Sequence, residues 1–146
     1  ADDKNYVVIY PNNDLGSDFI FKAYQKLDNN KRFRVFPSIR FEYFLTLLKN
    51  SQFIIGNSSA GIREAPYYGI GTVNVGNRQE NRALHHQIIN TECTVKAILK
   101  AVNYDFSKIE KDSHSFGIGN SASLFLASLQ SEKTWQVSKQ KLFIDI

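Results

Sequence analysis

The sequence predicts an α/β domain with an open, mostly parallel sheet that has helices on both faces. Short apolar runs alternate along the chain with segments whose apolar residues recur at helical spacing, an alternation typical of βαβ units. Polar, turn-forming residues follow the apolar runs. The chain has 146 residues, of which 42% are hydrophobic and 22% charged, and this composition suits one domain with a sizeable core.

The first predicted strand is YVVIY at residues 6–10, a continuous apolar run of the kind found in buried parallel strands. The turn-forming PNND at residues 11–14 ends it. A helix is expected next, and its apolar residues recur at helical spacing: Ile20, Tyr24 and Leu27. Ser17 is in position to cap this helix, which should end at Asn29.

Two more strands are expected at residues 33–36 (FRVF) and 53–55 (FII). The helix predicted between them has an apolar face made of Phe41, Phe44, Leu45 and Leu48. We expect these phenylalanines to pack in the core rather than to stack on nucleic-acid bases.

The second half of the chain continues the alternation. A short helix should end at Gly69, and strands are expected at Thr72–Val75 and around Ile88 and Ile89. Two further helices are indicated by Val95, Ile98, Leu99 and Val102, and by Ala122, Phe125, Leu126 and Leu129. Ser121 is in position to cap the second of them.

Composition and charge exclude several classes of protein. No stretch reaches the roughly 18 apolar residues of a membrane span, and the N-terminus lacks the apolar core of a signal peptide, so we expect a soluble cytoplasmic protein without a membrane partner. The net charge of +4 is carried by scattered basic residues, which disfavours nucleic acid as a partner and favours small anionic ligands. There is no methionine, and the chain opens directly before a strand, so we expect a piece of a longer protein.

Neither a disulfide nor a metal site is predicted. Cys93 is the single cysteine, and we expect it to be a small buried hydrophobic residue beside a helix start. His85 and His86 lack the i, i+4 spacing of a helical metal pair, and His114 stands apart in a polar loop.

The segment GNSSAGIREAP at residues 56–66 is the strongest candidate for a binding site. If the strand ends at Ile55, the backbone N–H groups of Ser58, Ser59 and Ala60 open the next helix, where they have no intrahelical acceptor and the helix dipole favours an anion. Phosphate binding is one interpretation. An ordinary serine cap of the helix is the other, and the spacing alone does not decide between them.

Two charged residues add to this candidate site. Glu64 lies among the apolar residues Ile62, Ala65 and Pro66, so its carboxylate needs partners if it is buried; either ribose hydroxyls or an ion pair with Arg63 would serve. Arg78 follows the fourth predicted strand, and its guanidinium is well shaped for a diphosphate.

The segments GNSSAGIREAPYYGIGTVNVGNRQENR, YPNNDLGS and RFEYFLTLLKNSQFIIGNSS resemble the C-terminal half of the hydrolysing UDP-N-acetylglucosamine 2-epimerases, which begin sialic acid synthesis. The resemblance covers residues 6–120. It implies the second, nucleotide-binding Rossmann-like domain of a GT-B fold over residues 1–130, followed by a segment at 131–146 that crosses back toward the first domain.

The resemblance also implies a set of UDP-binding residues. The diphosphate-binding serines fall on Ser58 and Ser59, the ribose-binding glutamate on Glu64 and the arginine after the next strand on Arg78. The uracil loop falls on Ile39, acting through backbone groups. The asparagine of the PNxD turn falls on Asn12, with Asp14 beside it.

The implied reaction converts UDP-N-acetylglucosamine and water to N-acetylmannosamine and UDP, by elimination of UDP and then hydration. No cofactor or metal is implied. The family's acid and base residues lie in the N-terminal domain, so this chain alone should hold no catalytic residue and be inactive, and the full-length enzyme should be a homo-oligomer. A related UDP-diacetamido sugar as substrate, half of a GT-B glycosyltransferase, and a non-catalytic nucleotide-binding module remain alternatives.

The family's second domain has a strand and helix before the position of Tyr6, and that strand is central to the sheet. We therefore expect the domain to lack its first strand. The Tyr6 strand should then pair either directly with the Phe53 strand or with a strand from another molecule.

Overall fold

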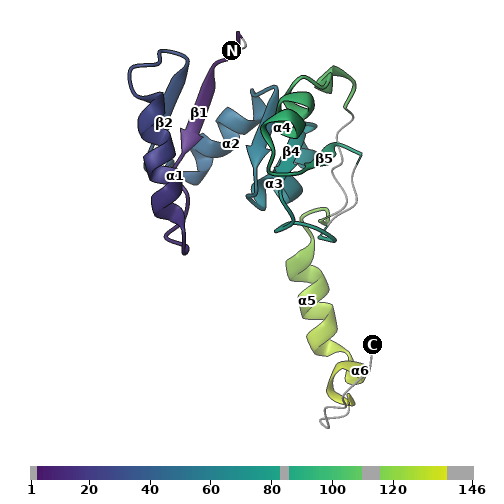
Figure 1. The fold of residues 1–146 in the computed structure, drawn as a ribbon. Helices are drawn as coiled ribbons and strands as arrows, with labels where there is room; N and C mark the ends of the chain where they lie inside the picture. Colours follow the sequence, from purple (N-terminus) through teal and green to yellow (C-terminus); the bar gives the residue numbers. More distant parts are fainter. Residues whose placement is uncertain (1–2, 83–85, 110–115, 138–146) are drawn as a thin grey trace. The chain divides into compact units, whose positions relative to one another are not determined.

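The computed structural model describes residues 3–82, 86–109 and 116–137. It is a mixed α/β fold with parallel strands in two sheets, which confirms the predicted class (Figure 1). The chain divides into two compact units, residues 1–50 and residues 51–146, and each is described by itself.

The first unit is a βαβα arrangement. Its elements are β1 (Tyr6–Ile9), α1 (Ser17–Tyr24), the 3-10 helix η1 (Gln25–Leu27), β2 (Phe33–Phe36) and α2 (Phe41–Lys49). β1 and β2 pair in parallel, with Tyr6 opposite Phe33 and Ile9 opposite Phe36. These elements agree with the predicted strands and helices to within a few residues at each end.

Aromatic contacts hold this unit together. The rings of Tyr6 and Phe33 stack across the two strands with their centroids 5.0 Å apart, and Tyr10 packs edge-on against Phe21 of α1. Leu48 is the one hydrophobic residue of the unit's described part that is buried, whereas Phe41 is 60% exposed. The prediction that Phe41 packs in the core is therefore wrong in this structure.

The second unit contains a three-stranded parallel sheet. Its elements are β3 (Phe53–Gly56), α3 (Ala60–Tyr68), β4 (Gly71–Val75), β5 (Ile88–Thr91), α4 (Val95–Val102), the 3-10 helix η2 (Phe106–Lys108), α5 (Ser121–Gln130) and α6 (Glu132–Trp135). β4 is the central strand, with Phe53 of β3 opposite Gly71 and Ile88 of β5 opposite Thr72. Gly69 ends α3 in the left-handed conformation, as predicted.

Helices α3 and α4 cover opposite faces of this sheet. The hydroxyl of Thr72 donates to the backbone carbonyl of Gly61 in α3, at 2.6 Å. The next residue along the strand, Val73, is fully buried with Ala101 and Val102 of α4. Because successive side chains of a strand point to opposite faces, the two helices lie on opposite sides of β4. The expected helices on both faces are confirmed for this unit.

The two predicted serine caps are not formed. Gly16 and Asn120 occupy the N-cap positions of α1 and α5, and neither helix start has a side-chain cap hydrogen bond. Ser17 and Ser121 are instead the first helical residues. A serine inside the first turn no longer has the extended backbone from which a cap hydroxyl reaches back to the second or third amide.

Helix α5 has no buried residue, and α6 folds against its C-terminal end. The indole Nε1–H of Trp135 donates to the carbonyl of Leu129 at 2.8 Å, and the hydroxyl of Thr134 donates to the carbonyl of Ser128 at 2.6 Å. Trp135 itself is 68% exposed. Residues 138–146 of the predicted C-terminal segment lie outside the described residues.

Of the two pairings considered for the Tyr6 strand, the direct one with the Phe53 strand is not formed: β1 pairs with β2, and β3 belongs to the other sheet. Cys93 was expected to be buried, but it is exposed. Within the described residues, no helix combines the length and hydrophobicity needed to cross a bilayer.

Candidate functional site

The turn between β3 and α3, called the serine turn below, is built from Gly56, Asn57, Ser58 and Ser59. Gly56 has a φ of 145°, which only glycine adopts easily, and this conformation turns the chain sharply out of the strand. Ser59 is the N-cap residue, yet its side chain makes no cap hydrogen bond. Its backbone carbonyl accepts from the amides of Ile62 and Arg63, at 2.9 and 3.0 Å, and so starts the helix.

This geometry leaves hydrogen-bond donors unused at the start of α3. The hydroxyl of Ser58 accepts from the amide of Ala60 at 3.3 Å, which occupies one of the three predicted donors. The amides of Ser58 and Ser59 have no acceptor among the described residues. Two backbone donors and the Ser59 hydroxyl are therefore available to an anion at the positive end of the helix dipole.

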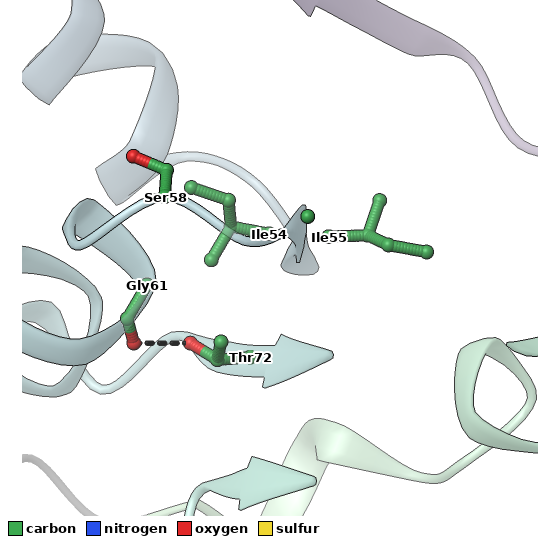
Figure 2. Close-up of a pocket in the computed structure, with 6 residues that line it drawn as sticks. Ile54, Ile55, Ser58, Gly61 and Thr72 are labelled. Carbon is green, nitrogen blue, oxygen red and sulfur yellow. Dashed lines mark hydrogen bonds between the residues drawn. The ribbon is translucent and has the colours of Figure 1, made fainter. Parts of the chain in front are cut away.

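Close packing of α3 on the sheet fixes the position of this turn. A Cβ atom on Gly61 would lie 2.6 Å from Cγ2 of Thr72, so only glycine allows the helix to approach β4 this closely. Figure 2 shows the Thr72–Gly61 hydrogen bond beside a small pocket, about large enough for one water molecule. The pocket is lined by Ile54, Ile55, Gly56, Ser58, Gly61 and Thr72.

Glu64 lies one turn into α3 and is half-buried. Its Oε2 atom is buried and has no hydrogen-bond partner. The guanidinium of Arg63 lies 5.7 Å from the ring centroid of Phe116, and Glu64 forms no ion pair within the described part of the chain. The ion pair of Glu64 with Arg63, one of the two roles open for this carboxylate, is thus not formed. A buried carboxylate oxygen without a donor is unfavourable, and such an atom marks a place where a ligand donor would be gained.

The loop after β4 is tied to the serine turn by a residue that the sequence did not single out. The side-chain Nε2 of Gln79 donates to the backbone carbonyl of Asn57 at 2.8 Å. Gln79 is only 4% exposed, and its Oε1 atom is buried without a partner. Arg78, next to it in the chain, is exposed. The sequence feature that could have identified Gln79 is its position beside Arg78 in GNRQ. Because most glutamines in loops are exposed, that position alone did not predict a buried contact.

The predicted site residues fall in both units. Ser58, Ser59 and Glu64 come together at the start of α3, and Arg78 lies on the loop that Gln79 joins to them. In the first unit, Asn12 and Asp14 are exposed on the turn between β1 and α1, where the Asp14 carbonyl accepts from the amide of Ser17 at 3.1 Å.

Ile39, half-buried between β2 and α2, completes the first unit's share of the predicted residues. Within each unit, the predicted residues come after a strand along the chain.

No group of three or more His, Cys, Asp or Glu residues suited to a metal ion occurs in residues 3–82, 86–109 and 116–137. His85 and His114 lie outside these ranges. His86 is exposed in the turn before β5.

Comparison with known proteins shows which protein family the chain is similar to. The family model described as UDP-N-acetylglucosamine 2-epimerase matches residues 1–130. A Neisseria meningitidis protein named UDP-N-acetylglucosamine 2-epimerase is 46% identical over 98% of this chain and 39% of its own length. A Legionella pneumophila protein named UDP-N,N'-diacetylbacillosamine 2-epimerase (hydrolyzing) is 31% identical over 80% of this chain and 31% of its own length.

A third relative, the polysialic acid biosynthesis protein P7 of Escherichia coli, is 34% identical over 68% of this chain and 25% of its own length. The chain thus spans between 25% and 39% of the lengths of these three relatives.

Proposed function

The chain belongs to the UDP-N-acetylglucosamine 2-epimerase family, and from this premise we propose that it is the UDP-binding part of a hydrolysing epimerase. The complete enzyme converts UDP-N-acetylglucosamine and water to N-acetylmannosamine and UDP, and so supplies sialic acid synthesis. UDP is eliminated first, and water then adds to the unsaturated sugar.

The observation that carries the proposal is the buried, unpartnered Oε2 of Glu64, close behind a helix start with two unused amides. In our proposal Glu64 accepts hydrogen bonds from the ribose hydroxyls. The amides of Ser58 and Ser59 and the Ser59 hydroxyl donate to the diphosphate. A nucleoside diphosphate presents both partners, hydroxyl donors and anionic acceptors, so one ligand satisfies both halves of the site.

Arg78 adds a positive charge to the diphosphate end of the site. As the bond between the sugar and UDP breaks, negative charge grows on the departing phosphate oxygen. Donors already aimed at that oxygen stabilise it, a contribution typically worth several kcal/mol in enzymes. In this account Ser58, Ser59 and Arg78 therefore serve departure of the leaving group, while the proton transfers belong to residues outside this chain.

The first unit provides the rest of the proposed UDP contacts. Ile39 contacts the uracil through its backbone, and Asn12 and Asp14 contact the ligand from the turn after β1. An N-terminal domain supplies the acids and bases, so the 146-residue chain alone should bind UDP without turning over a UDP-sugar. The complete enzyme works as a homo-oligomer.

The proposal is tested by calorimetric titration of the chain with UDP and with 2′-deoxyuridine diphosphate. Glu64→Gln should weaken UDP binding about tenfold or more, because hydrogen bonds to a charged group contribute about 1.5–3 kcal/mol. For the 2′-deoxy ligand the loss should be smaller, since one of the two hydroxyl partners is already missing. The control is Glu132→Gln, which changes an exposed glutamate of α6 in the same unit and should leave both affinities unchanged. Equal losses for the two ligands would contradict the ribose role of Glu64.

A second candidate substrate, a UDP-diacetamido sugar, is suggested by the name of the Legionella relative, UDP-N,N'-diacetylbacillosamine 2-epimerase (hydrolyzing). The part of the enzyme outside this chain contacts the sugar, so the present residues do not choose between the two. Incubating the full-length protein with each UDP-sugar and identifying the free sugar released separates the candidates. Transfer of the sugar to an acceptor, without release of a free sugar, would instead indicate a glycosyltransferase.

A further inference from the structure

We propose that Gln79 is a positioning residue that aims the backbone amide of Ser58 at the diphosphate. This inference rests on the proposed function, because it assigns a role within the same UDP site. It concerns the hydrogen bond from the Gln79 side chain to the Asn57 carbonyl, which joins the loop after β4 to the turn after β3.

The Asn57 carbonyl and the Ser58 amide belong to one peptide unit. That unit is planar, and the described chain contains no cis peptide bond, so the C=O of Asn57 and the N–H of Ser58 point in opposite directions. A side chain that fixes the carbonyl therefore fixes the amide as well. The Ser58 amide has no acceptor among the described residues, so it is free to donate to a ligand on the side away from Gln79.

The hydrogen bond also strengthens the donor that it positions. Donation to a carbonyl polarises its peptide unit, and hydrogen bonds in such chains reinforce one another where water is excluded. Gln79 is 4% exposed, and the Nε2–O distance of 2.8 Å is short for an amide donor. This bond sets the orientation of the Gln79 side-chain amide. If Oε1 stood in the place of Nε2, it would face the carbonyl oxygen of Asn57, which is also an acceptor.

Gln79 also couples two phosphate-binding elements. It follows Arg78 directly, so the residue that holds the serine turn sits on the same loop as the proposed cationic partner of the diphosphate. The buried Oε1 without a donor is a cost that a purely packed side chain would not carry. An apolar residue of the same shape would avoid that cost, but it would leave the Asn57–Ser58 peptide unheld.

The test compares UDP with uridine, because only UDP carries the diphosphate. Gln79→Met keeps the size of the side chain and removes its hydrogen bond. We expect this variant to bind UDP about tenfold more weakly than the parent chain and to bind uridine with unchanged affinity. In the parent, UDP should shift the Ser58 amide proton strongly downfield in NMR spectra, and in Gln79→Met this shift should be largely lost.

A second buried glutamine provides the control. Gln87 is 1% exposed and lies directly before β5, so Gln87→Met removes a buried amide from a different part of the unit. It should leave the ratio of UDP to uridine affinity unchanged even if stability falls. If Gln79→Met does not fold, Gln79→Glu serves in its place, because it keeps the shape and replaces the donor with a carboxylate that repels the Asn57 carbonyl.

The outcomes separate this proposal from the proposed function. If the parent binds UDP and Gln79→Met or Gln79→Glu binds it equally well, the positioning role is overturned and the UDP site stands. Equal weakening for UDP and uridine also overturns it, because the effect then does not act through the diphosphate. A parent chain that binds neither ligand overturns the UDP site and the role of Gln79 with it.

Discussion

Glu64 and Gln79 share a feature with one other described residue, Gln87: a buried side-chain oxygen that lacks a hydrogen-bond donor. Native proteins pair nearly all such atoms, so each exception calls for a cause. For Glu64 the proposed cause is the ligand, whose ribose hydroxyls would fill the gap. For Gln79 it is the bond made by the other end of the amide, which holds the Asn57 carbonyl.

The two residues differ in how far sequence could identify them. Glu64 was predicted as a site residue because an acid beside Ile62, Ala65 and Pro66 needs partners, and the structure buries its Oε2 as that argument requires. Gln79 was missed because a glutamine in a polar loop carries no comparable signal. Only the three-dimensional approach of two loops, 22 residues apart in sequence, reveals its contact.

Gly61 gives a test of the packing that positions the serine turn. Gly61→Ala should lower the free energy of unfolding by about 1–3 kcal/mol, because the new Cβ would lie 2.6 Å from Cγ2 of Thr72. Thr72→Ser removes that methyl group and keeps the hydroxyl that donates to Gly61. In the Thr72→Ser background the cost of Gly61→Ala should therefore be much smaller. Urea unfolding of the parent, the two single variants and the double variant measures this coupling, and purely additive effects would contradict it.

At the scale of elements, apolar periodicity predicted the strands and helices well, whereas residue type predicted the helix caps poorly. Val95, Ile98, Leu99 and Val102 located α4, which the structure places at Val95–Val102. Ser17 and Ser121 were predicted as caps from residue type alone, but each helix begins one residue too early for that role. Cap formation depends on the backbone conformation of a single residue, which an apolar pattern does not report.

Thr94 caps α4. Its side-chain oxygen accepts from the amide of Ala97 at 3.3 Å, at the start of a helix whose Ala101 and Val102 join the core. Thr94→Ala should therefore lower the free energy of unfolding by about 1 kcal/mol, and Thr94→Ser should cost much less. Ser121→Ala, at a helix start without a cap bond, is the matched control and should change stability by less than about 0.5 kcal/mol. A cost for Ser121→Ala equal to that of Thr94→Ala would contradict the cap assignment.

At the scale of the whole molecule, the sequence predicted one sheet, and the residues that the structure describes form two. The pairing within each sheet follows consecutive strands, as short βαβ connections favour. The local apolar pattern shows where strands form, but it does not determine which strands distant in sequence pair. It therefore could not predict whether the Tyr6 strand pairs with the Phe53 strand. The division into residues 1–50 and 51–146 also divides the predicted site, with Asn12 in one unit and Ser58 in the other.

The central claim is that the turn between β3 and α3, together with Glu64 of α3, binds UDP, and an NMR titration with UDP tests it most directly. We predict that the amides of Ser58, Ser59 and Arg78 shift together along one binding curve. Ser59→Ala and Glu64→Ala should each lower the UDP affinity obtained from that curve. Unchanged UDP affinity in both variants, or shifts confined to residues outside this set, would contradict the account.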